Sequence, residues 1–374
     1  MLKRKRFVVA AGVTSALAVL SVVAVANLER LIAWQVRRAV IEAERLNDTI
    51  QAIPEGRFEL LFCGTGTPRF SPDRGQSCLA VVAGGRLLLF DAGMGAARQL
   101  RTFRAPTERL EAVFLTHLHS DHAAGLGDVL HDTWHFGRDR PVDVVGPPGT
   151  LRVHRGFLDV FAEDEAMRRP GVEVGYGHKN SAMGRALEVR IETGEAVTVY
   201  DRAGLVVKAF RVDHPTWRFA YGYRIDFAGK SVVVSGDTAY TPAIVSHGRG
   251  ADVLVHEAMN VEMMEIVADV MGERAGDGVG AISRGRLRFI ESRHTPTDQV
   301  ARVAREAGVK MLVVTHLTPP IPSSRIAEYA FIRGMGDIYD GPIRVARDGM
   351  RLTLVESGGS AEGDGADRAS QLRN

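Results

Sequence analysis

Three histidines and an aspartate fall within six positions, in the sequence HLHSDH from residue 117 to residue 122, directly after the apolar run VFLT. In an extended bend His117 and His119 point to the same side, so both imidazoles can bind one cation. Asp121 and His122 then begin a helix and face a second position nearby, and Gly125 lets this helix start tightly. The motif therefore predicts half of a two-metal site.

The other half is expected from residues much further along the chain. Apolar runs end on His214, Asp237 and His316, and strand ends in an α/β body open onto one rim where distant side chains meet. His214 would complete the first metal position, His316 the second, and Asp237 would bridge both. Histidine and carboxylate ligands suit two Zn²⁺ ions and tolerate Mn²⁺ or Fe²⁺. Such a pair shares a water and lowers its pKa from about 15.7 towards about 7, which predicts a metal-bridging hydroxide as the nucleophile.

The elements that position these residues are short apolar runs broken by glycine, which predict strands between residues 57 and 356. Glycine-containing turns at 83–85 and 228–230 favour antiparallel hairpins. Helical patterns lie between other strands, at 123–131, 242–248 and 295–308. Strands mixed with helices on two outer faces indicate a layered α/β body.

The N-terminus has a different character. Residues 7–26 carry no charge and follow KRKR, so we expect residues 1–26 to be a transmembrane anchor or signal segment. The basic cluster would stay in the cytoplasm, so the catalytic domain would be membrane-anchored outside it, periplasmic or extracellular, or secreted if cleaved after Ala26. An amphipathic linker helix is expected at 27–56, the hydrolase domain at 57–356 and a disordered tail at 357–374.

Composition limits the partners. The formal charge is +2, and the four basic residues at 3–6 account for +4, which leaves −2 for the rest and makes nucleic acid an unlikely partner. A membrane partner is expected through the N-terminal helix, and a homo-oligomer is possible. Cys63 and Cys78, the only cysteines, cannot build a thiolate zinc site. They could form a disulfide outside the cytoplasm or remain two small buried side chains, and both alternatives stay open.

The motif THLHSDHAAGL, with GTGTPRFSPDRGQ before it and SGDT, HEA, RHTPTDQ and VVTHL after it, resembles the metallo-β-lactamase superfamily over about residues 57–355. Within it the order is similar to the branch shared by ribonuclease Z and the zinc arylsulfatases. The resemblance implies a four-layered αββα sandwich with the site at one edge. It also implies seven metal ligands: His117, His119, Asp121, His122, His214, Asp237 and His316.

The same resemblance implies roles outside the ligand set. His294, in SRHTPTDQ, would serve as proton donor or transition-state stabiliser, with Asp121 as the second catalytic residue. Asp91, His256 and Glu257 would orient the ligands by hydrogen bonds.

The substrate is predicted from smaller features. Relatives of ribonuclease Z usually carry a long arm that grips transfer RNA between the matches to His214 and Asp237, where this chain has a hairpin of 22 residues. We therefore expect a metal-dependent hydrolase of small sulfate or phosphate esters, arylsulfatase-like, with a small anionic ester as substrate. Trp134, Trp217 and Tyr221 would line its pocket unless they pack in the core. The alternatives are a ribonuclease Z-like endoribonuclease acting on transfer-RNA precursors and a non-catalytic metal-binding module.

Overall fold

The computed structural model describes residues 27–42, 54–168, 184–215, 217–275, 285 and 287–355. The chain divides into two compact units, Met1–Thr49 and Ile50–Asn374. In the first unit the described residues form one exposed helix over 27–42, within the stretch predicted to be an amphipathic linker. The second unit contains the predicted catalytic residues.

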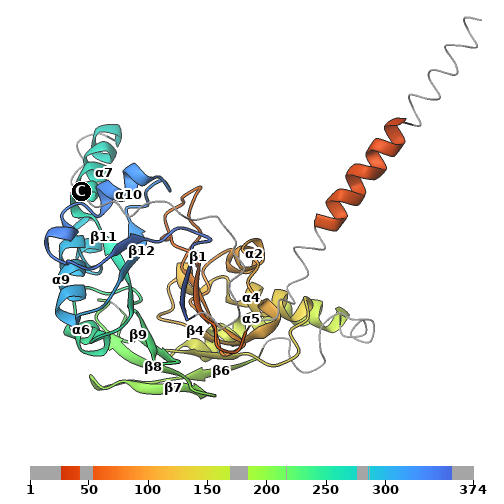
Figure 1. The fold of residues 1–374 in the computed structure, drawn as a ribbon, viewed down its shortest axis with the longest axis horizontal. Coiled ribbons are helices and arrows are strands. Elements are labelled where there is room, and N and C mark those ends of the chain that lie inside the picture. Colours follow the sequence, from red (N-terminus) through yellow and green to blue (C-terminus); the bar gives the residue numbers. More distant parts are fainter. Residues whose placement is uncertain are drawn as a thin grey trace, which may run out of the picture. The chain divides into compact units, whose positions relative to one another are not determined.

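Two seven-stranded sheets form the centre of the second unit (Figure 1). The first sheet has the order β14 (Arg351–Val355), β1 (Phe58–Gly64), β2 (Cys78–Ala83), β3 (Arg86–Phe90), β4 (Leu110–Phe114), β5 (Asp143–Gly146) and β6 (Arg185–Glu188). The second has the order β13 (Ile343–Val345), β12 (Leu312–Thr318), β11 (Val253–Met259), β10 (Lys230–Val234), β9 (Ala220–Phe227), β8 (Leu205–Val212) and β7 (Val197–Arg202). Neighbouring strands are parallel from β3 to β6 and from β10 to β13.

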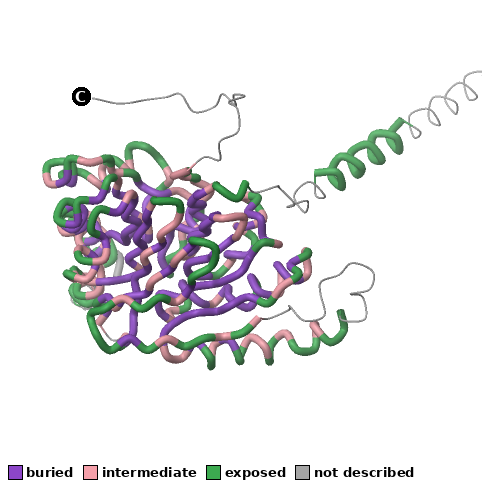
Figure 2. Tube along the Cα trace, turned by 60° about the horizontal axis from the view of Figure 1, so that its bottom comes forward, coloured by how far each residue is buried: buried purple, intermediate pink, exposed green. Residues whose placement is uncertain are grey.

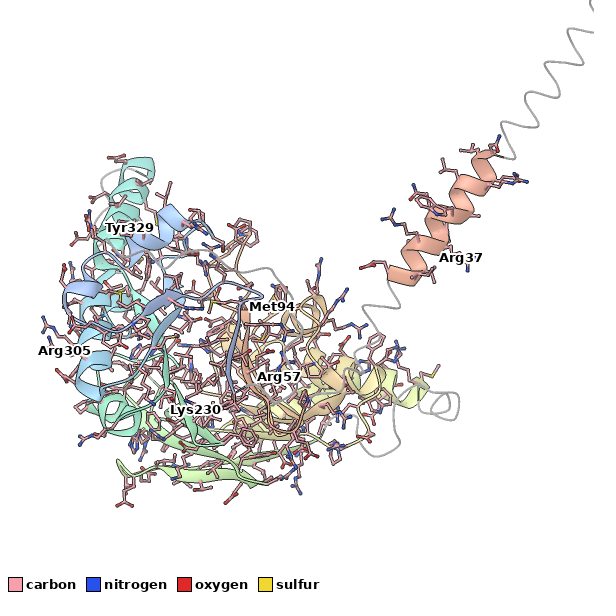
Figure 3. The ribbon with its side chains drawn as sticks, viewed as in Figure 1. Arg37, Arg57, Met94, Lys230, Arg305 and Tyr329 are labelled. Atoms are coloured by element: carbon pink, nitrogen blue, oxygen red, sulfur yellow. A yellow bond between two sulfur atoms is a disulfide. The ribbon has the colours of Figure 1, made fainter. Side chains whose placement is uncertain are left out.

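Helices cover the outer face of each sheet (Figure 1). On the first sheet lie α2 (Ala96–Thr102), α3 (Ser120–Ala123), α4 (Leu126–His135) and α5 (Thr150–Arg168). With the second sheet are α6 (Pro242–Gly248), α7 (Val261–Ala275), α9 (Thr297–Ala307) and α10 (Arg325–Phe331). Arg305 of α9 and Tyr329 of α10 mark the solvent side of this layer (Figure 3).

Three apolar clusters hold the layers together. The first lies between the two sheets and includes Phe90, Phe114 and Tyr223, whose rings pack with centroids 5.0–5.6 Å apart. The second joins the first sheet to its helices, and the third joins the second sheet to α6 and α9. Figure 2 shows the resulting buried interior. This is the αββα arrangement that the resemblance implies.

The predicted elements compare well with those observed. The turns at 83–85 and 228–230 both connect antiparallel strands, β2 with β3 and β9 with β10. The helix expected at 242–248 has those bounds, and the one expected at 295–308 is α9. The single helix expected at 123–131 is replaced by α3 and α4, which meet at Gly125.

The predicted membrane-anchored localisation is corrected. In the part of the chain that the structure describes, no helix is both long and apolar enough to cross a bilayer. Residues 7–26, on which the prediction rested, lie outside that part, as does the predicted tail at 357–374. Apolar composition alone does not distinguish a spanning helix from other apolar segments.

Cys63 and Cys78 form a disulfide. The two residues face each other from the antiparallel strands β1 and β2, at a shift in register where Gly64 pairs with Cys78. Both side chains are buried among the residues between the first sheet and its helices. Of the two alternatives left open by the sequence, the paired one is present.

Candidate metal centre

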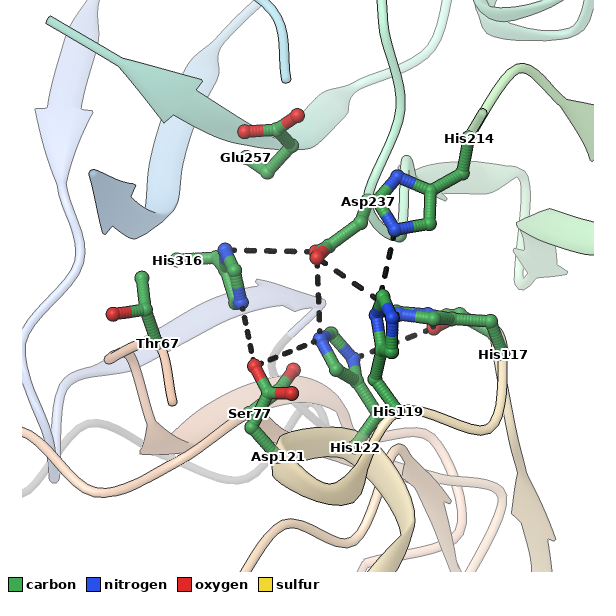
Figure 4. A network of polar contacts seen from close by, with 12 residues as sticks. Thr67, Ser77, His117, His119, Asp121, His122, His214, Asp237, Glu257 and His316 are labelled. Atoms are coloured by element: carbon green, nitrogen blue, oxygen red, sulfur yellow. Dashed lines mark hydrogen bonds and ion pairs between the residues drawn. The ribbon is translucent and has the colours of Figure 1, made fainter. Parts of the chain in front are cut away.

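Residues from four separate segments gather where strands of both sheets end. His117 follows β4, His214 follows β8, Asp237 follows β10 and His316 lies near the end of β12. Their potential ligand atoms form two groups, within each of which all atoms lie within 4.8 Å of one another: His117, His119, His214 and Asp237, and Asp121, His122 and His316. Figure 4 shows both groups meeting at Asp237.

The first group contains three imidazoles that converge. Nε2 of His117 lies 2.8 Å from Nδ1 of His119 and 3.9 Å from Oδ2 of Asp237. Nε2 of His214 lies 3.4 Å from the same Nδ1. Atoms bound to one tetrahedral divalent cation at about 2.0–2.1 Å are about 3.3 Å apart, so these spacings match a single coordination sphere.

The second group is built around the carboxylate of Asp121. Oδ2 of Asp121 lies 3.4 Å from Nε2 of His122 and 3.2 Å from Nε2 of His316. Asp237 reaches both histidines as well, with Oδ2 3.4 Å from Nε2 of His122 and Oδ1 3.5 Å from Nδ1 of His316. Asp237 therefore contacts residues of both groups, as a bridging carboxylate requires.

His316 takes its position from a break in the strand pairing. Glu257 pairs with Thr315 and Ala258 with Leu317, so His316 is an extra residue in β12, with a φ of 47°. A bulge of this kind redirects a side chain at the edge of a site. A left-handed conformation costs a non-glycine residue about 1–3 kcal/mol, which the surrounding structure must offset.

Asp91 fixes the orientation of His122. Its carboxylate accepts hydrogen bonds from Nδ1 of His122 at 2.7 Å and from the backbone N–H of Thr116 at 2.8 Å. Because Nδ1 is held by Asp91, the other ring nitrogen of His122 faces Asp121 and Asp237. His214 is held in the same way, with Nδ1 3.1 Å from the carbonyl oxygen of Arg293.

The charges at the centre favour cations. Burial would lower the pKa of His122, but the charges of Asp237, Asp91 and Asp121 raise it well above its usual value. Three carboxylates thus converge on one imidazole and leave an excess of negative charge that a divalent cation can balance. Burial instead lowers the pKa of His117 well below its usual value and that of His119 to about 4, so both rings are neutral, as metal ligands must be.

Several buried atoms of the centre have ion-pair contacts of 3.4–3.5 Å but no hydrogen bond within the described residues. Nε2 of His122, Oδ1 of Asp237 and Nδ1 of His316 have no hydrogen bond there. An unsatisfied buried polar atom costs about 1–3 kcal/mol. Metal coordination would satisfy such atoms, so the residues present fit a pair of divalent cations.

Glycine is required at position 125 because another backbone segment lies close to it, whereas the sequence suggested that it lets the helix start tightly. A Cβ at this position would lie 2.1 Å from the carbonyl oxygen of Gly93. The backbone N–H of Gly125 donates to the carbonyl oxygen of Ala92 at 2.9 Å. Glycine therefore allows the start of α4 to approach the 92–93 loop closely, and this contact positions the segment that carries Asp121 and His122.

His294 lies beside the ligand groups, within a third group with Asp237 and His316. Its Nδ1 lies 3.3 Å from Oε1 of Glu257, which also accepts hydrogen bonds from the backbone N–H groups of Thr238 and Thr295. Burial lowers the pKa of His294, but the charge of Glu257 outweighs it and the pKa rises to about 9. The imidazole can therefore hold a proton at neutral pH.

The remaining predicted residues are placed less centrally. His256 points to the opposite side of β11 from Glu257, and its Nδ1 bonds to the carbonyl oxygen of Glu257 at 2.6 Å. Trp134 and Tyr221 are buried in the apolar clusters, so the structure assigns them to packing and not to a pocket wall. Only Trp217 reaches the centre, where its indole N–H donates to Nε2 of His119 at 2.6 Å.

A cavity of about 690 Å³ opens beside the centre. His119, Asp121, His214, Asp237, His294 and His316 line one part of it. Much of the remaining lining is apolar and comes from α7 and residues 287–290, which were not predicted to form an apolar pocket wall. Methionine, valine and leucine carry no chemical signature, so only the helical spacing on α7 could have indicated a shared face.

Comparison with known proteins places the chain in a family. Residues 86–317 match the model described as the beta-lactamase superfamily domain. The chain belongs to the metallo-β-lactamase superfamily. It is 33% identical over 267 residues to a ribonuclease Z of Mycobacterium marinum, covering 70% of this chain and 87% of the relative. It is 31% identical over 302 residues to a ribonuclease Z of Mycobacterium bovis, covering 79% and 98%.

Solved structures agree with the fold. The human tRNase Z, short form, superimposes with a TM-score of 0.54 at 24% identity, over 80% of this chain and all of that one. This metallo-β-lactamase superfamily member is a metal-dependent hydrolase of ester bonds, and its histidine and aspartate clusters fit divalent metal ions.

Two predictions about the substrate are wrong. The predicted arylsulfatase-like activity is overturned by the similarity to ribonuclease Z over 70–79% of the chain. The same similarity overturns the prediction that nucleic acid is an unlikely partner. Both predictions rested on absences: a short hairpin between His214 and Asp237, and a low net charge. Net charge does not report local charge, and Arg69 and Arg293 both line the cavity beside the centre.

Proposed function

We propose that this chain is a dinuclear zinc phosphodiesterase of the ribonuclease Z type, which cleaves RNA precursors such as precursor transfer RNA. The observation that carries the proposal is the similarity to mycobacterial ribonuclease Z along nearly the whole length of those relatives. The converging His and Asp side chains support it, because nitrogen and carboxylate ligands in tetrahedral spacing suit Zn²⁺.

His117, His119 and His214 would hold one ion and Asp121, His122 and His316 the other, with Asp237 between them. When bound, the two ions supply a nucleophile derived from water at neutral pH and positive charge for the phosphoryl oxygens. Asp91 keeps the His122 ring in its binding orientation, and the carbonyl oxygen of Arg293 does so for His214.

His294 is the proposed proton donor. It lines the cavity together with Asp121 and Asp237, and Glu257 holds its imidazole in the protonated form. In phosphodiester hydrolysis the leaving oxygen gains negative charge as its bond to phosphorus breaks, and a positioned imidazolium can protonate it. Asp121 would assist from the same cavity by accepting a hydrogen bond from the attacking water.

The test is cleavage of a precursor transfer RNA with a 3′ extension by the zinc-loaded chain. We expect a single endonucleolytic cut, abolished by Asp237→Asn and reduced by about 10²–10⁴ in rate by His294→Ala, the range for loss of a general acid. Binding of two zinc equivalents without cleavage of this RNA would refute the proposed substrate. Turnover of an aryl sulfate without turnover of RNA would refute the proposed bond type.

A further inference from the structure

The cavity beside the metal centre has one strongly apolar side. On α7, Met264, Val267, Ala268 and Met271 line it, at the i, i+3, i+4 and i+7 spacing that places side chains on one helix face. Leu287, Phe289 and Ile290 extend this surface, which we call the α7 wall. Figure 1 shows α7 directly after β11, the strand that carries Glu257. The α7 wall and the predicted metal ligands line the same cavity.

The other side of the cavity is suited to an anion. Besides the predicted ligands and His294, its charged residues are Arg69 and Arg293. The Arg293 guanidinium lies 3.4 Å from the ring centroid of Phe289, and its buried Nε has no hydrogen-bond partner within the described residues. A ligand that satisfies both sides carries a phosphoryl group at one end and an apolar group at the other.

The apolar group that fits the α7 wall is aliphatic. Apart from Phe289, whose ring lies against the Arg293 guanidinium, the wall is aliphatic. A nucleobase would therefore lie mostly against methionine, valine and alanine, and each N–H or carbonyl group of its edges buried there without a partner costs about 1–3 kcal/mol. An aliphatic chain has no such groups and gains about 0.8 kcal/mol for each buried methylene. The cavity volume of about 690 Å³ lies within the range of about 300–1,000 Å³ typical of sites for small organic ligands.

We infer that the centre also hydrolyses phosphodiesters that carry an aliphatic chain of several carbons, with the phosphate at the metal ions and the chain along the α7 wall. The inference rests on the proposed phosphodiesterase activity and adds a substrate class to RNA. In the reaction a water oxygen forms a bond to phosphorus, the bond to the leaving oxygen breaks, and that oxygen departs as the alcohol or phenolate. The phosphomonoester product keeps the aliphatic chain.

The test uses the zinc-loaded full chain and a series of alkyl 4-nitrophenyl phosphates with methyl, propyl and hexyl groups, which share one leaving group. We expect kcat/KM to rise with chain length, by up to about fourfold for each methylene that is buried. Equal rates along the series would overturn the inference and leave the phosphodiesterase activity intact. Absence of hydrolysis of every member, together with intact RNA, would refute the proposed function itself.

Binding supplies a readout that does not depend on turnover. Calorimetric titration with methyl phosphate and hexyl phosphate should show tighter binding of the hexyl compound and a more negative heat-capacity change, because burial of apolar surface has that signature. Equal affinities and equal heat-capacity changes would overturn the inference even in an inactive preparation.

Two variants on α7 locate the effect. Met271 is 40% exposed and lines the cavity, whereas Ile266, 58% exposed, lies on the same helix outside it. We expect Met271→Gln to lower the hexyl-to-methyl ratio of kcat/KM severalfold and Ile266→Gln to keep the wild-type ratio. Equal ratios in both variants would contradict the assignment. Weaker binding of a short RNA oligonucleotide to Met271→Gln, with no change for hexyl phosphate, would assign the wall to nucleobases instead.

Discussion

Replacing Asp91 by asparagine should weaken the second metal position and leave the fold intact. Asparagine tolerates the left-handed backbone at this residue, where φ is 59°, and keeps an acceptor for the N–H of Thr116. It cannot accept from Nδ1 of His122 with its amide nitrogen, so the 2.7 Å bond that orients the ring is lost. A hydrogen bond to a charged group contributes about 1.5–3 kcal/mol, which corresponds to about a 10- to 150-fold loss of metal affinity.

The assay is a zinc titration against a fluorescent chelator, which resolves two binding steps. We expect Asp91→Asn to weaken one step by that factor and to change the other much less, because Asp91 bonds directly to His122 and is linked to the first group only through the Thr116 hydroxyl, which lies 3.1 Å from Nδ1 of His117. Asp128→Asn, on the exposed surface of α4, is the matched control and should bind as the wild type does. Two unchanged binding steps in Asp91→Asn would refute the assignment of Asp91 as the residue that orients His122.

Three further predictions concern the metal, the glycine contact and the proton donor. Removing the metal should abolish hydrolysis. It should also lower the free energy of unfolding by about 2.7 kcal/mol relative to protein with metal at 100 times its Kd. Equal unfolding temperatures of the metal-free and metal-loaded protein in scanning calorimetry would contradict metal binding by the folded state. Gly125→Ala should destabilise the chain by about 1–3 kcal/mol in denaturant unfolding, because its Cβ would meet the Gly93 carbonyl, whereas Gly156→Ala in α5 has open space and should not. Glu257→Gln should move the alkaline limb of the pH–rate profile to lower pH, because the Glu257 charge raises the pKa of His294; an unmoved limb would exclude His294 as the donor.

The sequence determined the local half of the site. The HLHSDH spacing fixes which side chains share a side of the bend, because the backbone between residues 117 and 122 is too short to allow many arrangements. The remote residues His214, Asp237 and His316 could also be named in advance, because each follows or ends an apolar strand and strand ends meet at one rim. The hairpin turns and α6 were predictable because their sequence signals are contained within a few residues.

Tertiary structure alone decided the features that depend on distant segments. The bulge that turns His316 inward arises from pairing between β11 and β12, and the need for glycine at 125 arises from the close approach of Gly93. Burial assigned Trp134 and Tyr221 to the core, although their chemistry also suits a pocket. The α7 wall became part of the site because α7 borders the cavity, and nothing in its methionines and valines specifies which surface they will face.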